Sequence, residues 1–414
     1  MSSLAMRLPF LVAAALLGNA TAVHAAGWSG RIGLEHQHFW NDPEYAGQYS
    51  DYGSAFIEPK YNAEWDNGKQ QFNFSGFARL DPRDENRQHA DIRELEYLLI
   101  GDRYELRAGI RKVFWGVTEA QHLVDVINQS DLVENPDGET KLGQPMLNLA
   151  LIHDSGTLDL FLMPSFRERT FPGTDGRPRT RFVVDEDRVS YEADKKNRHV
   201  DAAVRWSMSA NGFDVGLSYF YGTGRTPRLL PRLIAPGEMV LAPRYDLLHQ
   251  FGVDATYVDG PVLWKLEAVA REELGTRYYA SSAGFEYTVS GVFDSVADIG
   301  LLSEYLYDSR GQVATRTDIA PSEFTAPPSH LQNDLLIGMR LGFNDVQSSQ
   351  ILIGVIPDLD GRGLTYSIEA ERRLGDTWKV NLEWRGYAGS IPANDVLYAT
   401  RNDDYLKLWL SWYF

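Results

Sequence analysis

Four arginines of this chain carry the side chain best suited to binding an anion: Arg79, Arg107, Arg111 and Arg205. A guanidinium donates two parallel hydrogen bonds to a carboxylate or a phosphate. The segments that hold these arginines flank one long connection, 113–145, so we expect them to form one wall. Three glutamates that would neutralise this wall lie among them: Glu94, Glu96 and Glu105. The sequence therefore leaves open both an anion-attracting wall and a charge-compensated one.

The connection 113–145 is too long and too patterned for a plain loop. Thr118 and Gln121 have the spacing of a capping box, and apolar residues follow on one helical face, which predicts a short helix at about 119–128. Its apolar side would be buried if the loop folded inward and narrowed a pore. Three acidic residues are then candidates for a constriction that faces the arginines: Asp125, Asp131 and Glu134. The alternative is a loop that covers an outer rim or contacts another subunit.

Catalytic and metal-binding signals are weak. The chain has no Cys, which excludes disulfides, thiolate metal sites and a Cys nucleophile. It also lacks a Gly-x-Ser-x-Gly motif, a phosphate-binding glycine loop and a His-Glu-x-x-His motif. We therefore expect no catalytic residue, no metal, no cofactor and no enzymatic activity.

The composition limits the kinds of binding partner that we expect for this chain. A formal net charge of −17 argues against nucleic acid, whose phosphates require a basic face. Two arginine-rich stretches, 164–181 and 225–244, could nevertheless meet the phosphates of lipopolysaccharide or an anionic substrate, or could simply be solvated. Aromatic residues make up 12% of the chain although its mean hydropathy is −0.32.

The first residues read as an export signal. Arg7 precedes a short apolar run, Leu8 to Leu17, and Val23-His24-Ala25 provides small residues for cleavage after Ala25. We expect residues 1–25 to be removed and residues 26–414 to form one domain.

Beyond residue 27 the dominant pattern is alternation of apolar and polar residues, the period of a β-strand. Trp378, Val380, Leu382 and Trp384, for example, alternate with polar residues that include Arg385. The polar phase of such strands, that is, the set of alternate positions that carry polar residues, also contains Lys265 and Arg340. The arginines and glutamates named above belong to it as well. A charged side chain facing lipid costs roughly 2–4 kcal/mol at the membrane centre, so we expect this phase to line a wet lumen. The candidate pore-lining residues are Arg79, Arg107, Arg111, Arg205, Lys265, Arg340, Arg385, Glu94, Glu96 and Glu105. A lattice of ion pairs that only stiffens the wall is the alternative for any one of them.

Connections alternate between tight turns, such as Asp66-Asn67-Gly68 and Asp259-Gly260, and longer loops. Counting the segments between them gives eighteen strands, with sixteen as the alternative because 350–357 alternates weakly. Short turns on one side and long loops on the other are typical of an antiparallel transmembrane β-barrel of the outer membrane.

The last residues make a resemblance explicit. Leu408, Leu410, Trp412 and Phe414 alternate up to a terminal aromatic, which resembles the C-terminal signature of Gram-negative outer-membrane β-barrels. The resemblance implies location in the outer membrane, contact with lipid and lipopolysaccharide, and recognition of Phe414 by the barrel-assembly machinery. Length and strand count are most similar to the eighteen-stranded porin-like group, and no subfamily motif matches.

These observations predict a porin-like channel for passive diffusion of small polar or charged solutes, including anionic ones. An export conduit for an anionic polymer is the first alternative. A barrel-embedded enzyme or scaffold is the second. If loop 113–145 narrows the pore, deleting 118–138 should raise the single-channel conductance.

Overall fold

The computed structural model describes residues 23–292, 294–317 and 326–414. The predicted signal peptide lies outside these residues except for Val23–Ala25, which begin the first strand.

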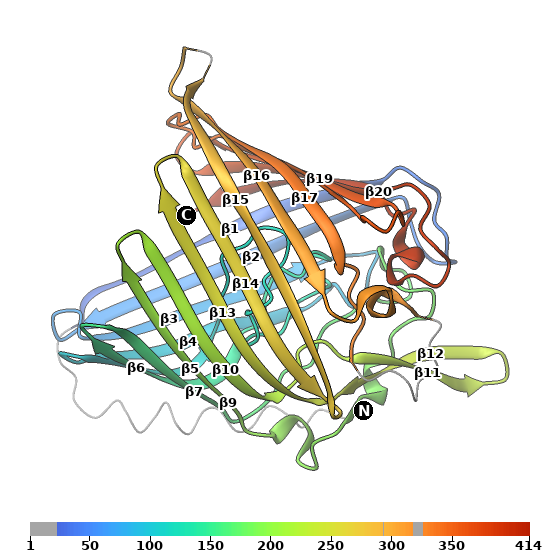
Figure 1. Ribbon diagram of the computed structural model, residues 1–414, viewed down its shortest axis with the longest axis horizontal. Helices are drawn as coiled ribbons and strands as arrows, with labels where there is room; N and C mark the ends of the chain where they lie inside the picture. Colours follow the sequence, from blue (N-terminus) through green and yellow to red (C-terminus); the bar gives the residue numbers. More distant parts are fainter. Residues whose placement is uncertain (1–22, 293, 318–325) are drawn as a thin grey trace.

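Eighteen antiparallel strands form one closed sheet (Figure 1). Its strands are β1 (Val23–Phe39), β2 (Asp51–Trp65), β3 (Gln70–Leu80), β4 (Ala90–Ile100), β5 (Tyr104–Arg111), β6 (Gln144–His153), β7 (Gly156–Met163), β9 (Asp201–Ala210), β10 (Phe213–Thr223), β13 (Leu247–Asp259), β14 (Val262–Glu273), β15 (Thr276–Val292), β16 (Ala297–Asp308), β17 (Asn333–Gly342), β18 (Gln350–Pro357), β19 (Leu364–Leu374), β20 (Trp378–Ala388) and β21 (Tyr405–Tyr413). Closure comes from β1, which pairs with β2 on one side and β21 on the other. The prediction of eighteen strands is confirmed, and the alternative of sixteen is wrong because β18 pairs over its whole length with β19 and over residues 350–355 with β17.

The turns follow the chemistry predicted from the sequence. Short connections lie at one end of the barrel and the long loops at the other, although the two-residue turn 274–275 between β14 and β15 also lies at the loop end (Figure 1). In the turn after β2, Asn67 and Gly68 have φ of 56° and 82°, the left-handed conformation that these two residues tolerate best. Such turns fix the register of the strands that they join.

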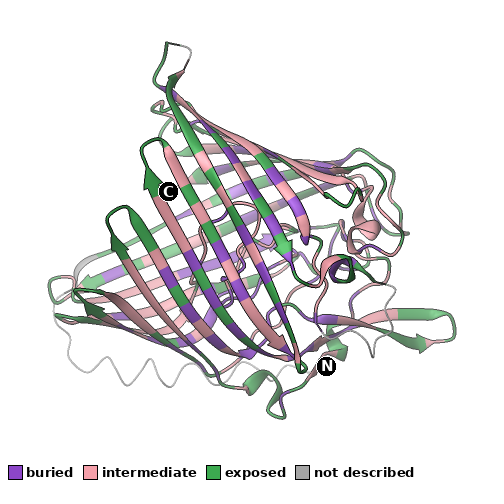
Figure 2. Ribbon diagram, in the orientation of Figure 1, coloured by how far each residue is buried: buried purple, intermediate pink, exposed green. Residues whose placement is uncertain are grey.

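Burial alternates along the strands in the sense opposite to that of a soluble protein (Figure 2). Outward residues are apolar and exposed, as with Leu34 at 65% and Phe251 at 62%, whereas inward Glu267 and Ser282 are 0% exposed. Aromatic pairs such as Trp28–Tyr61 and Phe213–Tyr257, with ring centroids 5.1 Å and 4.1 Å apart, lie near the tight turns. An outer surface of this kind requires an apolar surrounding.

The long loops contain further structure. A small sheet joins β8 (Ser190–Tyr191), β11 (Arg228–Ala235) and β12 (Glu238–Tyr245), and the β11–β12 hairpin extends beyond the barrel (Figure 1). Short 3₁₀ turns occur at η1 (Glu186–Arg188), η2 (Lys196–Arg198), η3 (Gly311–Thr315) and η4 (Val396–Thr400). Within the described residues, no helix is long and apolar enough to cross a membrane.

Candidate functional site: a loop docked inside the barrel

Residues 112–143 leave β5, enter the barrel and return to β6; we call them the inward loop. Figure 1 shows it in blue-green within the barrel. The prediction that this long loop folds into the lumen is confirmed. The predicted helix at 119–128 is wrong, since these residues form bends, one short turn and irregular backbone. One helical bond is diverted: the Val124 N–H, which a helix at 119–128 would direct to Ala120 O, donates instead to Glu267 Oε2 of the barrel wall.

Two fully buried glutamates of the wall provide those carboxylates. Oε1 of Glu267 on β14 accepts from the backbone N–H groups of Val117 (2.7 Å) and Thr118 (3.0 Å), and from the Thr118 hydroxyl (2.8 Å). Its Oε2 accepts from Val124 N at 3.1 Å. Glu304 on β16 accepts in the same way from the N–H groups of residues 119 and 120, at 2.8–3.0 Å. A buried carboxylate is stable only when it is saturated with donors, so the loop and these two glutamates require one another.

Cations of the wall complete this attachment. Arg340 Nη2 donates to Glu119 Oε2 at 2.8 Å, and Lys265 Nζ lies 3.9 Å from the same oxygen. Both cations also approach Glu286: Arg340 Nε lies 3.7 Å from its Oε1, and Lys265 Nζ lies 3.4 Å from its Oε2. The predicted wall residues Lys265 and Arg340 thus meet at Glu119, in the first half of the inward loop.

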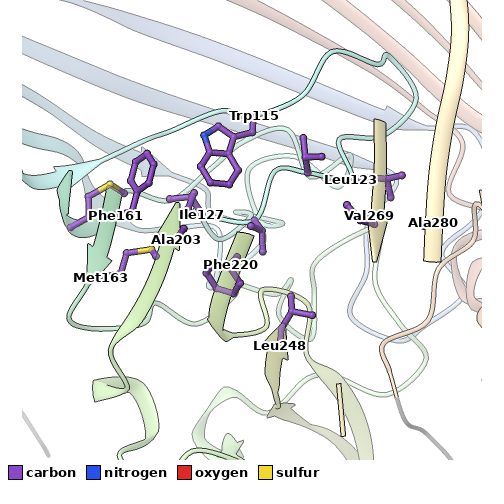
Figure 3. Close-up of a cluster of buried hydrophobic side chains, with 13 residues drawn as sticks. Trp115, Leu123, Ile127, Phe161, Met163, Ala203, Phe220, Leu248, Val269 and Ala280 are labelled. Atoms are coloured by element: carbon purple, nitrogen blue, oxygen red, sulfur yellow. The ribbon is translucent and has the colours of Figure 1, made fainter. Parts of the chain in front are cut away.

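The other side of the loop is apolar and packs on an apolar area of the wall (Figure 3). Val124 and Ile127 are 0% exposed, and the Trp115 ring lies 5.6 Å from that of Phe161. The wall contributes Met146, Met163, Ala203, Phe220, Leu248, Val269 and Ala280. Each fully buried side chain of this kind is worth about 1.5–3 kcal/mol, so packing and hydrogen bonds hold the loop together.

The second half of the loop is fastened to the opposite wall by arginines. Nε and Nη2 of Arg79 both bond the Glu134 carboxylate, the shortest contact being 2.7 Å. Arg93 Nη2 lies 2.7 Å from Asp131 Oδ2, and Arg385 Nη2 lies 3.5 Å from Asp137 Oδ2. The loop therefore spans the lumen from wall to wall.

The three predicted acidic constriction residues are buried. The side chains of Asp125 and Asp131 are 0% exposed and that of Glu134 is 7% exposed. Asp125 pairs with Lys141 of the same loop at 3.1 Å, while the other two meet wall arginines. In this structure the three carboxylates fix the loop in place and do not face open water.

His122 joins the two halves of the inward loop. Its Nε2 lies 3.3 Å from Glu139 Oε1, and its Nδ1 lies 3.8 Å from Glu267 Oε1. Burial lowers the pKa of the imidazole, but the carboxylates of Glu139 and Glu267 outweigh burial and raise the pKa to about 10. His122 is therefore a cation at neutral pH and a further tie between loop and wall.

The remaining predicted arginines are paired. Arg205 forms a two-bond contact with Asp254 at 2.6 and 2.7 Å, and its guanidinium lies 5.2 Å from the Trp115 ring. The other two pairs each join an arginine to a predicted glutamate: Arg107 to Glu105 and Arg111 to Glu96. Glu94 is partly buried on β4 and makes no ion pair with another described residue. The structure thus gives a charge-compensated wall.

A second loop, which the sequence left as a basic stretch, crosses the barrel mouth. This mouth loop (164–200) runs from β7 to the far side of the sheet, where Arg177 Nε donates to Asp403 Oδ1 at 2.6 Å and Gln48 Nε2 donates to Gly176 O at 3.0 Å. The Arg177 side chain is 0% exposed. Arg177 is therefore not solvated, and nothing in its local sequence marks the partner 226 residues away.

The described residues include no cluster of His, Cys, Asp or Glu that could hold a metal ion. The role of Glu267 and Glu304 as anchors was not predicted from the sequence. Their acceptor function depends on backbone groups more than 140 residues away, which no local pattern shows.

No protein-family model matches the chain, and neither does any curated protein. Solved structures do. OccD3 (OpdP) of Pseudomonas aeruginosa has a TM-score of 0.54 and 9% identity, over 95% of this chain and 92% of that one. OccK5 (OpdH) of the same organism has a TM-score of 0.53 and 10% identity, and OccK8 (OprE) has a TM-score of 0.52 and 12% identity. Each match covers 95% of this chain and 99% of the other chain. The chain therefore has the fold of these outer-membrane porins, an eighteen-stranded porin-like barrel.

Proposed function

We propose that this protein is an outer-membrane channel for passive diffusion of small polar or charged solutes. One observation carries the proposal: a closed barrel with a polar inward face is crossed by a loop that is fastened to both walls. A barrel of this strand number is too wide for its own side chains to fill, so a docked loop narrows the path. A narrowed polar path admits small solutes and excludes large ones.

The pairing of the charges supports a proposal for the class of solute. Each of the four predicted arginines has a carboxylate partner: Arg79, Arg107, Arg111 and Arg205. The wall therefore offers local dipoles more than a net positive charge. This supports passage of polar solutes of either sign and gives anionic solutes no general advantage.

Orientation and partners belong to the same proposal. Long loops on the outer side and short turns on the periplasmic side are the usual arrangement of such barrels. The exposed apolar outer face would contact lipid, with lipopolysaccharide at the loop end. Phe414 would mark the last strand for the assembly machinery after export directed by residues 1–25.

The polymer conduit is the weaker candidate. An extended polymer needs an unobstructed lumen, whereas the inward loop crosses the barrel and the mouth loop crosses its opening. Both are held by buried ion pairs or buried carboxylates, whose rupture costs several kcal/mol.

Swelling of proteoliposomes tests the proposal. Vesicles that contain the purified protein are diluted into isotonic solutions of uncharged, anionic and cationic solutes of increasing size. We expect swelling rates that fall steeply with size and differ little with charge. Vesicles that swell no faster than protein-free controls in every solute would overturn the proposal.

A further inference from the structure

We infer that the periplasmic half of the lumen contains a subsite for uncharged, hydroxyl-rich solutes such as small sugars. It lies on β1–β3, at a patch formed by Ser29, Asn62, Glu64, Gln71 and Asn73, which we call the amide patch. This inference rests on the proposed function, since a solute reaches the patch only if the barrel conducts.

The amide patch faces the lumen. Asn73 and Gln71 share the phase of Arg79 on β3, which reaches the inward loop, and they pair in register with Asn62 and Glu64 on β2. The next outward residue, Phe74, packs instead against the ring of Trp28. The patch is therefore part of the inner wall.

Water reaches this part of the wall. Ser29, Asn62 and Glu64 are exposed, whereas inward residues nearer the long loops, such as Ser54 and Arg79, are buried. The residues of the patch line a hollow of about 380 Å³. That volume lies in the range of small-molecule sites.

The polar groups of the patch are available. Ser29, Asn62 and Glu64 make no side-chain hydrogen bond or ion pair with another described residue. Asn73 has only one long bond, 3.4 Å to Glu96, and Gln71 donates to Gly68 O at 3.2 Å. Amides offer donors and acceptors together, which is what hydroxyl groups need because each hydroxyl both donates and accepts.

The nearest charges explain why the ligand is uncharged. Lys60 and Arg31 share the Glu58 carboxylate, at 3.0 Å and 2.8 Å, and Glu64 adds a negative charge on the other side of Asn62. The surroundings are thus nearly balanced, so neither sign of solute gains much. A solute would therefore be bound by the amide and hydroxyl groups of the patch.

The position of the amide patch would make it the second place, after the inward loop, where a solute contacts the wall of the lumen. Asn62 lies six residues beyond Phe56, the partner of Arg79, or about 20 Å along β2. A solute that has passed the inward loop would therefore meet the patch before it leaves the barrel.

Current block by glucose tests the inference in planar bilayers. Glucose added on the short-turn side should reduce the potassium chloride current through the wild-type channel. The double variant Asn62→Leu/Asn73→Leu should weaken the apparent affinity for glucose about fivefold or more, the effect of at least one lost neutral hydrogen bond. Thr157→Val, an inward residue near the same end on β7, is the matched control and should leave the affinity unchanged.

The outcomes separate the two proposals. A wild-type protein without ion conductance would overturn the proposed function. Conductance without glucose block, or equal block in the double variant and the wild type, would overturn the subsite alone. Gluconate that blocks more tightly than glucose would overturn the assignment to uncharged solutes, whereas weaker block by gluconate would support it.

Discussion

Replacing Glu267 by Gln should release the first half of the inward loop while leaving the barrel intact. The side chain keeps its size, but one carboxylate oxygen becomes an NH₂ group. Oε1 now accepts three hydrogen bonds and Oε2 accepts one, from Val124 N. In the variant the amide would place a donor against the Val124 donor, and the bonds to residues 117 and 118 would lose their ionic partner.

The size of the effect follows from these contacts. A hydrogen bond to a charged group contributes about 1.5–3 kcal/mol net of hydration, against about 0.5–1.5 kcal/mol for a neutral one. Losing one bond and weakening three therefore costs about 3 kcal/mol, even if part of the loss is recovered by local adjustment. That corresponds to roughly a hundredfold shift from the docked loop to released states. Packing and the Glu304 contacts remain, so release should be transient.

Single-channel recording measures this shift directly. Glu267→Gln channels should spend about a hundredfold more time in a high-conductance sublevel than wild-type channels. Glu94→Gln is the control, because it removes an inward carboxylate that makes no ion pair with another described residue. If both variants show the same noise and sublevels as the wild type, the account of Glu267 as an anchor is refuted.

Two further predictions concern the loops. His122 has a raised pKa, so the attachment that it provides is complete below its ordinary pKa of 6.5 and is lost as pH rises through about 10. Current noise should thus increase between pH 7 and 10, and a His122→Gln channel with the same pH profile would contradict this. At the mouth loop, Arg177→Met leaves Asp403 buried without its partner, which costs about 3 kcal/mol or more. Chymotrypsin should then cleave the loop about a hundredfold faster than in the wild type, while unchanged cleavage would show that the buried pair does not hold the mouth loop.

The strands could be predicted from the sequence because their two faces meet different surroundings. In β21, Leu408 and Leu410 are 46% and 37% exposed on the outside, whereas Lys407 and Ser411 are 4% and 0% exposed inside. The alternation is a property of consecutive residues, so it does not depend on contacts with distant parts of the chain. The same holds for the tight turns.

The functional site was harder to predict from the sequence than the strands were, since its contacts join segments that are distant in the chain. The capping-box spacing at Thr118 and Gln121 suggested a helix, but the Val124 N–H that such a helix would use goes to Glu267 of the barrel wall. Tertiary partners override a local propensity of this size. Most carboxylate partners of the arginines lie on other segments: Glu134 of the inward loop for Arg79, Glu96 for Arg111 and Asp254 for Arg205.

The β11–β12 hairpin was a missed element with a readable signal. Pro236 and Gly237 separate two apolar runs, and Gly237 has φ of 82°, as a tight turn requires. Residues 225–244 were predicted only as an arginine-rich stretch, because these strands belong to a separate small sheet, outside the alternation that identified the barrel.

Single-channel conductance with and without residues 118–138 tests the central claim most directly. The deletion removes Val124, Glu119 and Glu134, which contact Glu267, Glu304 and Arg79 respectively, while leaving every strand of the closed sheet in place. We expect discrete, ion-conducting steps for the wild type and a clearly larger unitary conductance for the deletion. Equal conductances would contradict a path narrowed by the inward loop, and silence of both proteins would contradict an open barrel.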